Sequence, residues 1–368
     1  MTEARKTALY GCHEKYGGKI VEFAGWLVSV QFGGILDEHR AVREAAGMFD
    51  VSYMGEFFVT GEDSLALIQK AVTNDMNNMV DGQVRYSPMC NDEGGTVDDL
   101  MVYRFSPDRY MLVVNGANVE KDFAWLSRIA SEFPRATLTN ASDDWAEIAL
   151  QGPASETILK KLTQTDLNGI RYYYFVPRAE VAGVNCILSR TGYTGEDGFE
   201  LYCAPEDAVA LWDALMEAGE DEGLVPAGLG ARDTLRFEAC MPLYGQELSE
   251  TTGPLEAGLG RFVSFTKGEF VGRDALLRMK EQGIPKKLVG FEMLERGIPR
   301  THYTIVRDGT TIGEVTTGSF APTIGKNLGI GYVTPDTESI GADIGVMIRG
   351  KQLLARTIKM PFYKRRAK

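Results

Sequence analysis

The alternation of apolar and polar positions predicts strands and helices in turn along the first part of the chain. Residues 36–46 have the spacing of a short helix, and residues 48–60 form an apolar run with an interrupting glycine, which indicates a strand. Further along, apolar runs at 83–89, 96–103 and 110–115 follow one another with short turns between them. This order is typical of an antiparallel meander with helices packed beside it, an α+β arrangement.

The pattern changes in the last third of the chain. Residues 258–267 resemble a strand, and a charged helix is predicted over residues 273–281, ended by Gly283 and Pro285. The apolar runs that follow are short and have no helix between them; they cover residues 288–293, 304–307, 311–316, 328–333, 343–349 and 354–359. Strands at this spacing predict a small β-barrel or sandwich as a separate C-terminal domain.

Two adjacent carboxylates, Asp98 and Asp99, follow a glycine turn at Gly94 and Gly95, where the 96–103 strand begins. Neighbouring side chains on a strand point to opposite faces, so the two carboxylates cannot both serve one pocket. We expect one of them to face inward and the other to be structural or solvated. Taken alone, this pattern is also typical of a polar hairpin tip.

Two further stretches combine glycine with charged residues. Three glycines within seven residues indicate a shaped loop after Arg190, and Glu200 lies on the apolar strand that leaves this loop. A predicted helix that opens at Gly228 carries Arg232 and Arg236 one turn apart on the same face. Such a pair is also typical of solvated charge or of a surface ion pair.

Composition narrows the classes of function. Hydrophobic residues make up 44% of the 368 residues and charged residues 24%, as in an ordinary globular protein of two or three domains. The formal net charge of −12 argues against a general nucleic-acid or anionic-membrane surface. No run of about 18 apolar residues is present, and the N-terminus has no apolar signal core, so a cytoplasmic location is expected.

Cysteine and histidine give no metal or redox motif. The five cysteines are scattered without a Cys-x-x-Cys pair, which fits reduced and mostly buried thiols. The three histidines are not at zinc-ligand spacing, so a metal hydrolase is not expected. A nucleophile elbow, a phosphate loop and a dinucleotide fingerprint are also missing from the sequence.

Seven segments, in this order, resemble the glycine cleavage T-proteins, a family of tetrahydrofolate-dependent aminomethyltransferases. They are VEFAGW (21–26), EHRAVR (38–43), GMFDVS (47–52), GGTVDDL (94–100), RTGYTGE (190–196), GARDTLR (230–236) and LYGQE (243–247). Each segment is short, but the resemblance extends over nearly the whole length of the chain. The resemblance implies a folate-binding α+β region of mixed and antiparallel sheets with packed helices, followed by a C-terminal β-barrel.

The implied domain boundaries follow from the resemblance and the pattern together. Residues 1–260 would form the folate-binding region, divided into two subdomains with about residues 51–136 inserted. Residues 261–285 would be a connector, and residues 286–368 the barrel domain.

The resemblance also implies roles for individual residues. Asp98 matches the family's essential aspartate, which lies near the folate nitrogen that receives the one-carbon unit; Asp99 is then its structural partner. A carboxylate there can orient an amine, help to move its proton and stabilise nearby positive charge. Glu200 matches the acidic residue that reads the pterin ring, whose edge presents an N–H and an amino group side by side.

Further positions match the walls of the folate site. The resemblance places Tyr86, Tyr193, Met54 and Asn115 along the slot for the pterin and aminobenzoyl rings. Arg232 matches a folate-site arginine that suits an anionic ligand. Tyr363 and Arg365 lie where the family closes the site from the barrel domain. The family usually has histidine where this chain has Tyr53, which keeps an aromatic plane and a polar tip.

The implied activity transfers the methylene of an aminomethyl group, held on the lipoyl arm of the glycine cleavage H-protein, to tetrahydrofolate. Ammonia leaves and 5,10-methylenetetrahydrofolate forms. Two alternatives remain: a related tetrahydrofolate-dependent demethylase of a small methylated substrate, and a non-enzymatic folate-binding regulator. That last group is marked by a Lys-Gly-Cys-Tyr motif, whereas this chain has Glu238-Ala-Cys240-Met. Overall closeness and the presence of Asp98 favour the aminomethyltransferase.

Overall fold

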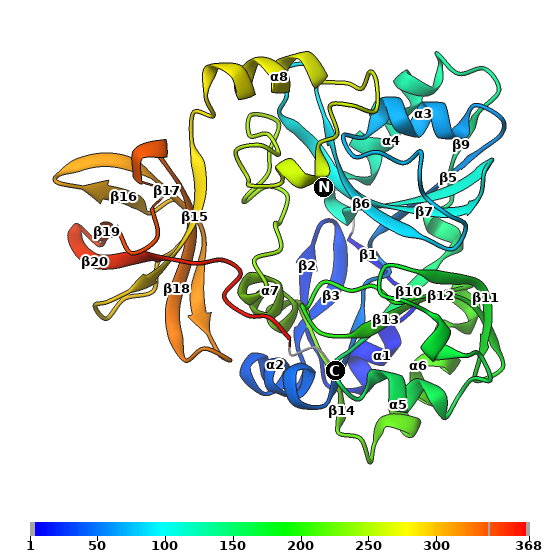
Figure 1. Cartoon of the computed structure of the whole chain (residues 1–368). Helices are drawn as coiled ribbons and strands as arrows, with labels where there is room; N and C mark the ends of the chain where they lie inside the picture. The colour runs from blue at the N-terminus through cyan, green and yellow to red at the C-terminus, as the bar shows by residue number, and fades with distance from the viewer. Residues whose placement is uncertain (1–3, 338, 366–368) are drawn as a thin grey trace. The chain divides into compact units, whose positions relative to one another are not determined.

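The computed structural model describes residues 4–337 and 339–365, and the chain falls into two units (Figure 1). Unit 1 comprises Met1–Ile68, Met76–Tyr86 and Leu100–Leu235, and unit 2 comprises Gln69–Asp75, Ser87–Asp99 and Arg236–Lys368. Residues 1–3 and 366–368, the ends of the two predicted domains, lie outside the described residues. Each unit is described by itself below.

A six-stranded sheet forms one half of unit 1. In spatial order its strands are β11 (Phe175–Val181), β12 (Val184–Ser189), β13 (Gly198–Cys203), β10 (Ala146–Gln151), β4 (Ala46–Asp50) and β14 (Leu224–Pro226). All neighbouring pairs are antiparallel except β14 with β4. Helices α5 (Ser155–Lys160) and α6 (Ala208–Gly219) pack on its outer face, where Trp212 and Leu215 join a core with Ile148 and Leu201.

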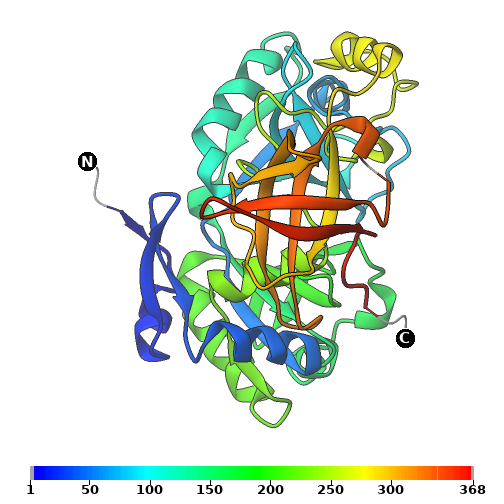
Figure 2. The same cartoon turned by 90° about the vertical axis from the view of Figure 1, so that its left-hand side faces the viewer.

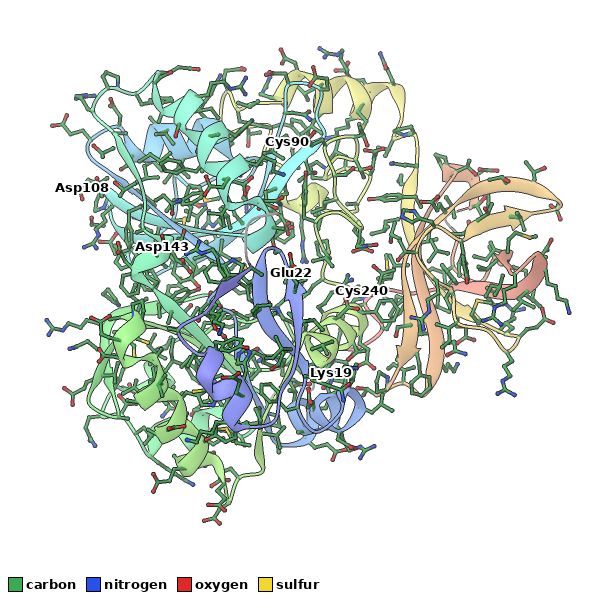
Figure 3. All side chains as sticks on the ribbon, turned by 180° about the vertical axis from the view of Figure 1, so that it is seen from behind. Lys19, Glu22, Cys90, Asp108, Asp143 and Cys240 are labelled. Carbon is green, nitrogen blue, oxygen red and sulfur yellow. The ribbon has the colours of Figure 1, made fainter. Side chains whose placement is uncertain are left out.

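A five-stranded sheet forms the other half of unit 1. In spatial order its strands are β6 (Val84–Cys90), β7 (Thr96–Ser106), β8 (Arg109–Val114), β5 (Gly55–Thr60) and β9 (Thr137–Asn140). The end of β6 and the start of β7 belong to unit 2. Figure 3 labels Asp108 at the turn between β7 and β8. The order β6-β7-β8 confirms the meander that the sequence predicts.

The inner faces of the two sheets pack against each other within unit 1. Tyr103 and Val113 of the five-stranded sheet share a buried core with Phe175, Ile187 and Tyr202 of the six-stranded sheet. Because helices cover the outer faces, central strands such as β8 and β10 are buried on both sides, which is why β8 is a continuous apolar run. The opposite face of the five-stranded sheet is covered by α3 (Ser64–Ala71) and α4 (Val119–Ala130), as Figure 1 shows.

A second inner core lies beside strand β4. Its helices are α2 (Ile35–Glu44) and α7 (Leu229–Glu238), which contribute Val42, Ala231 and Leu235. They pack over Phe49 of β4 and Ala149 of β10. The N-terminal elements complete unit 1: they are α1 (Tyr10–Lys15) and a three-stranded sheet with the order β1 (Arg5–Lys6), β3 (Trp26–Gln31) and β2 (Lys19–Phe23).

Unit 2 ends in a closed barrel of six antiparallel strands, as predicted (Figure 2). In spatial order they are β15 (Lys287–Met293), β18 (Lys326–Val333), β17 (Thr310–Ala321), β16 (Thr304–Arg307), β19 (Asp343–Ile348) and β20 (Lys351–Ile358). Pairing of β15 with β20 closes the ring. Helix α8 (Arg273–Gln282) confirms the predicted charged helix.

Two predicted strands are wrong. The run over residues 48–60 is not one strand: it is divided between β4 and β5, which belong to different sheets. Residues 258–267 hold a single 3-10 turn, Gly260–Phe262, and otherwise irregular backbone. Their apolar side chains, Val263 and Phe265, pack with Phe270 and Leu276 in a small core of unit 2 instead of alternating on a sheet. A short apolar run is ambiguous for this reason, because burial under a loop gives the same composition as burial in a strand.

No helix in the described part of the chain is both long enough and apolar enough to cross a membrane.

A buried ion pair lies in unit 2, where the sequence also allowed solvated charge. Arg236 and Glu247 are 2% and 1% exposed, with Nη1 and Oε2 3.0 Å apart. The hydroxyls of Thr316 and Thr317 each donate to Glu247 Oε1 at 2.6 Å, and the Leu243 N–H donates to Oε2. The carboxylate therefore ties the loop after α7 to strand β17.

We expect Glu247→Ala to lower the free energy of unfolding by about 3–5 kcal/mol, because it removes the carboxylate that is paired with the buried Arg236 charge. Denaturant unfolding followed by circular dichroism measures this change. Asp343→Asn is the matched control, since Asp343 pairs with Arg356 on the surface and its loss should be undetectable. Equal effects of the two substitutions would contradict this assignment.

Candidate active site

Polar side chains gather on the inner face of strands β10, β13 and β12. In the ladder Glu147 lies opposite Tyr202, Ala149 lies opposite Glu200, and Glu200 lies opposite Ser189. Because strand side chains alternate between faces, these residues share one face, whereas Ile148 and Leu201 point into the outer core.

Glu200 is held by hydroxyl groups and is partly exposed. The Thr191 hydroxyl donates to Glu200 Oε2, and the Ser189 hydroxyl lies 2.8 Å from the Thr191 hydroxyl. Burial raises the pKa of the Glu200 carboxyl, while the Thr191 hydrogen bond, the Arg232 charge and the Tyr103 hydroxyl act in the opposite direction. A carboxylate accepts about four hydrogen bonds, so Glu200 keeps acceptor positions for a ligand.

Arg232 faces this carboxyl group from helix α7. Its guanidinium lies 4.8 Å from the centre of the Tyr193 ring, a cation–π contact. It also interacts electrostatically with Glu200, Glu147 and Tyr53. The structure thus brings together three of the residues that the sequence assigned to the site: Glu200, Arg232 and Tyr193.

The loop that carries Thr191 and Tyr193 folds around Gln151. The Gln151 amide donates to the Thr191 carbonyl at 3.0 Å and its oxygen accepts from the Thr194 hydroxyl at 2.9 Å. A Cβ atom at Gly192 would lie 2.0 Å from Gln151 Oε1, and one at Gly198 would lie 2.5 Å from Gln151 Nε2. A Cβ atom at Gly198 would also lie 2.7 Å from the Leu150 carbonyl oxygen, so glycine is required there, while at Gly192 the loop backbone packs directly on the Gln151 side chain.

Tyr53 and Met54 follow strand β4, and a buried network on Asp50 fixes them. Asp50 accepts hydrogen bonds from the Thr7 hydroxyl at 2.6 Å and from the Ser52 N–H at 3.0 Å. His13 Nε2 lies 2.9 Å from Asp50 Oδ2, the same oxygen that accepts from Thr7. Tyr53 is 4% exposed; burial raises the pKa of its hydroxyl, and the nearby Arg232 charge acts in the opposite direction. Met54 packs against both inner cores.

Asn115 and Tyr86 belong to the five-stranded sheet. Asn115 follows β8, and the pairing of Gly55 with Val114 brings it beside Met54. A Cβ atom at Gly116 would lie 2.2 Å from the Tyr53 carbonyl oxygen, so the Asn115 turn touches the Tyr53 backbone. Alternation puts Tyr86 on the same face of β6 as Val84, which lies in the core between the sheets.

Asp98 and Arg365 are part of unit 2. Asp98 is fully buried on β7, whereas Asp99 is partly exposed, which confirms that one member of the pair faces inward. The turn before it is held against a neighbouring loop: the Thr96 hydroxyl donates to the Thr252 carbonyl at 2.9 Å, and a Cβ atom at Gly95 would lie 1.8 Å from the Glu250 carbonyl. Arg365 is partly exposed near the end of the described chain.

Sequence reasoning missed Glu147, Tyr103 and Tyr202. Glu147 is 3% exposed, and Tyr103 and Tyr202 are buried between the sheets with their hydroxyls 3.0 Å apart. Burial raises the pKa of Glu147 well above its usual range, and the nearby Glu200 and Glu56 carboxyls raise it further. The available signal was an acidic residue inside an otherwise apolar strand, which calls for a polar partner.

Two family models match the chain. The GCVT N-terminal domain matches residues 9–267, and the glycine cleavage T-protein C-terminal barrel domain matches residues 286–364. The chain belongs to the glycine cleavage T-protein family. The proteins named aminomethyltransferase from Desulfitobacterium hafniense strain Y51 and Halalkalibacterium halodurans are 53% and 51% identical to it. Each match covers 99% of this chain and 100% of the relative.

A solved structure supports the same membership. The crystal structure of glycine cleavage system aminomethyltransferase T from Bartonella henselae is 32% identical to this family member, with a TM-score of 0.92. The alignment covers 99% of both chains.

Proposed function

We propose that this aminomethyltransferase of the glycine cleavage system uses tetrahydrofolate as its acceptor and the lipoylated H-protein as its donor. Ammonia leaves from the aminomethyl group on the lipoyl arm, and the methylene passes to tetrahydrofolate to give 5,10-methylenetetrahydrofolate. Full-length relatives at 50–53% identity that carry the name aminomethyltransferase are the observation that supports this most strongly.

The polar face of unit 1 fits a pterin in its chemistry. Glu200 is a partly exposed carboxylate with acceptor positions left over, which suits the adjacent N–H and amino group of a pterin edge. Tyr193 offers an aromatic face beside it, and Arg232 offers a positive charge for an anionic ligand. We assign ligand binding to these three residues together with Met54, Asn115, Tyr86 and Arg365.

Tetrahydrofolate would supply the nitrogen that accepts the one-carbon unit. We assign to Asp98 the orientation of that amine and the movement of its proton. Asp98 suits this role because it is a fully buried carboxyl group on a rigid strand, and the Gly94-Gly95 turn before it is fixed by hydrogen bonds. A buried carboxylate also stabilises positive charge that develops nearby.

The overall test is a coupled assay with tetrahydrofolate and aminomethyl-loaded H-protein, run beside calorimetric binding of tetrahydrofolate alone. We expect turnover to 5,10-methylenetetrahydrofolate. Folate binding without turnover would contradict the proposed donor, and no folate binding would contradict the proposed acceptor.

Asp98→Asn should reduce turnover by about a hundredfold or more, because general acid–base catalysis contributes about 10²–10⁴-fold. Folate affinity should stay within about tenfold, or about 1.4 kcal/mol, since the amide keeps the shape of the side chain. Asp99→Asn, one residue further along the strand, is the matched control and should keep most of the turnover. Equal losses of binding and turnover in Asp98→Asn would sink the catalytic assignment.

Glu200→Ala should weaken tetrahydrofolate binding by about 1.5–3 kcal/mol, because it removes charge-assisted hydrogen bonds to the pterin. Glu200→Gln should fall in between, since an amide can accept but cannot pair with two donors in parallel. Isothermal titration calorimetry measures both variants. Unchanged affinity in Glu200→Ala would remove this residue from the site.

A further inference from the structure

Glu147 is a second carboxyl group on the inner face that carries Glu200. Because Glu147 lies opposite Tyr202 and Glu200 lies opposite Ala149, the two carboxyl groups are diagonal neighbours on adjacent antiparallel strands. Glu147 is 3% exposed, and its Oε2 atom has no hydrogen-bond partner among residues 4–337 and 339–365. A buried carboxylate in this position would lose hydration that the protein does not replace.

A chain of hydroxyl groups leads from the neighbour of Glu147 to Glu200. Tyr202 lies opposite Glu147 in the ladder and interacts with its carboxyl group. The Tyr202 hydroxyl lies 3.0 Å from the Tyr103 hydroxyl. The Tyr103 hydroxyl lies 3.3 Å from the Thr191 hydroxyl, and Thr191 donates to Glu200. Each hydroxyl can donate one hydrogen bond and accept another, so the direction of the chain depends on which end holds the proton.

The groups around Glu147 and Glu200 stabilise negative charge on the two carboxyls to different extents. Glu147 faces Glu200 and Tyr202 of β13, Glu56 of β5, Arg232 of α7 and Tyr53 after β4. Two of these neighbours are carboxyl groups, and the Glu56 carboxyl oxygens also have no hydrogen-bond partner within the described chain. Glu200 instead accepts the Thr191 hydrogen bond and lies near the Arg232 charge. Negative charge is therefore better stabilised on Glu200.

We propose that Glu147 is a positioning residue that holds the proton of this pair, so that every hydroxyl of the chain donates toward a negatively charged Glu200. In this state Glu147 donates to Tyr202, Tyr202 to Tyr103 and Tyr103 to Thr191. The chain keeps the Glu200 carboxylate in place for the ligand. Ionisation of Glu147 at higher pH reverses the Tyr202 hydrogen bond and adds like charge next to Glu200, which weakens its hold on the ligand.

The effect of Glu147 on ligand binding rests on the proposed function. The protonation of Glu147 does not. Glu147→Gln tests both, because the amide can donate to Tyr202 as the protonated acid does but cannot ionise. A raised pKa means that folded Glu147 keeps a proton that the unfolded chain releases above its ordinary pKa. The wild type therefore loses stability as pH rises from the unfolded pKa toward the folded one, and Glu147→Gln lacks this loss.

The first measurement is denaturant unfolding of the wild type and Glu147→Gln from about pH 5 to about pH 8, a range in which buried glutamates are known to titrate. We expect the free-energy difference between them to change with pH with a slope of about one proton. A difference that is independent of pH would contradict the proposal that Glu147 holds the proton. This outcome does not depend on which ligand the protein binds.

The second measurement is calorimetric binding of tetrahydrofolate over about pH 6 to about pH 9, chosen to cover the documented range of buried carboxyl groups. We expect wild-type affinity to fall severalfold at the alkaline end and Glu147→Gln affinity to stay level. The same pH profile in both proteins would overturn the link to the ligand. Absence of binding in the wild type would instead contradict the proposed function. The unfolding measurement would still show whether Glu147 holds the proton.

Tyr202→Phe tests the chain itself, since it removes one hydroxyl and keeps both carboxyl groups. We expect it to weaken tetrahydrofolate binding at neutral pH by about threefold to tenfold, the effect of losing about one hydrogen bond. Tyr110→Phe is the matched control, because Tyr110 is equally buried and its hydroxyl has no hydrogen-bond partner in the described residues. Equal effects of the two substitutions would overturn the role of the chain.

Discussion

The cost of removing carboxyl groups from water is the constraint on which the centre of unit 1 depends. Glu200, Glu147 and Glu56 lie between two stacked sheets, where apolar side chains could be buried at a lower free-energy cost. One guanidinium, a row of hydroxyls and a retained proton compensate for that cost. The surrounding architecture can be understood as the means of holding these compensating groups in position.

The scaffold does this with rigid elements on three sides. The pairing of β10 with β13 fixes the positions of Glu147 and Glu200. Helix α7 supplies Arg232, and the loop after β12 supplies Thr191. Gln151 fixes that loop by hydrogen bonds to Thr191 and Thr194. A site built in this way keeps a charged side chain available to a ligand without rearrangement, because neighbouring backbone already determines its position.

Local signals predicted the fold well, and long-range pairing limited the prediction of the site. The six barrel strands, helix α8 and the glycine turn before Asp98 follow from alternation and turn chemistry, which act over a few residues. The same local signals predicted a strand wrongly over residues 258–267, because the apolar side chains there are buried by packing beneath loops. Glu147 was missed because its significance lies in Tyr202, some 55 positions away in sequence but opposite it in the ladder. A local sequence pattern does not predict a partner that is so distant in sequence.

Two arginines of one helix show how far tertiary context changes the meaning of a motif. Arg232 and Arg236 lie one turn apart on α7, and the sequence offers the same two interpretations for both. Arg236 is enclosed with Glu247 and two threonine hydroxyls, so its charge is neutralised locally and serves stability. Arg232 is partly exposed and interacts with two carboxyl groups, Glu200 and Glu147, neither of which forms a close ion pair with it in the described residues. Its positive charge is therefore shared between several groups, whereas that of Arg236 is matched to one buried carboxylate.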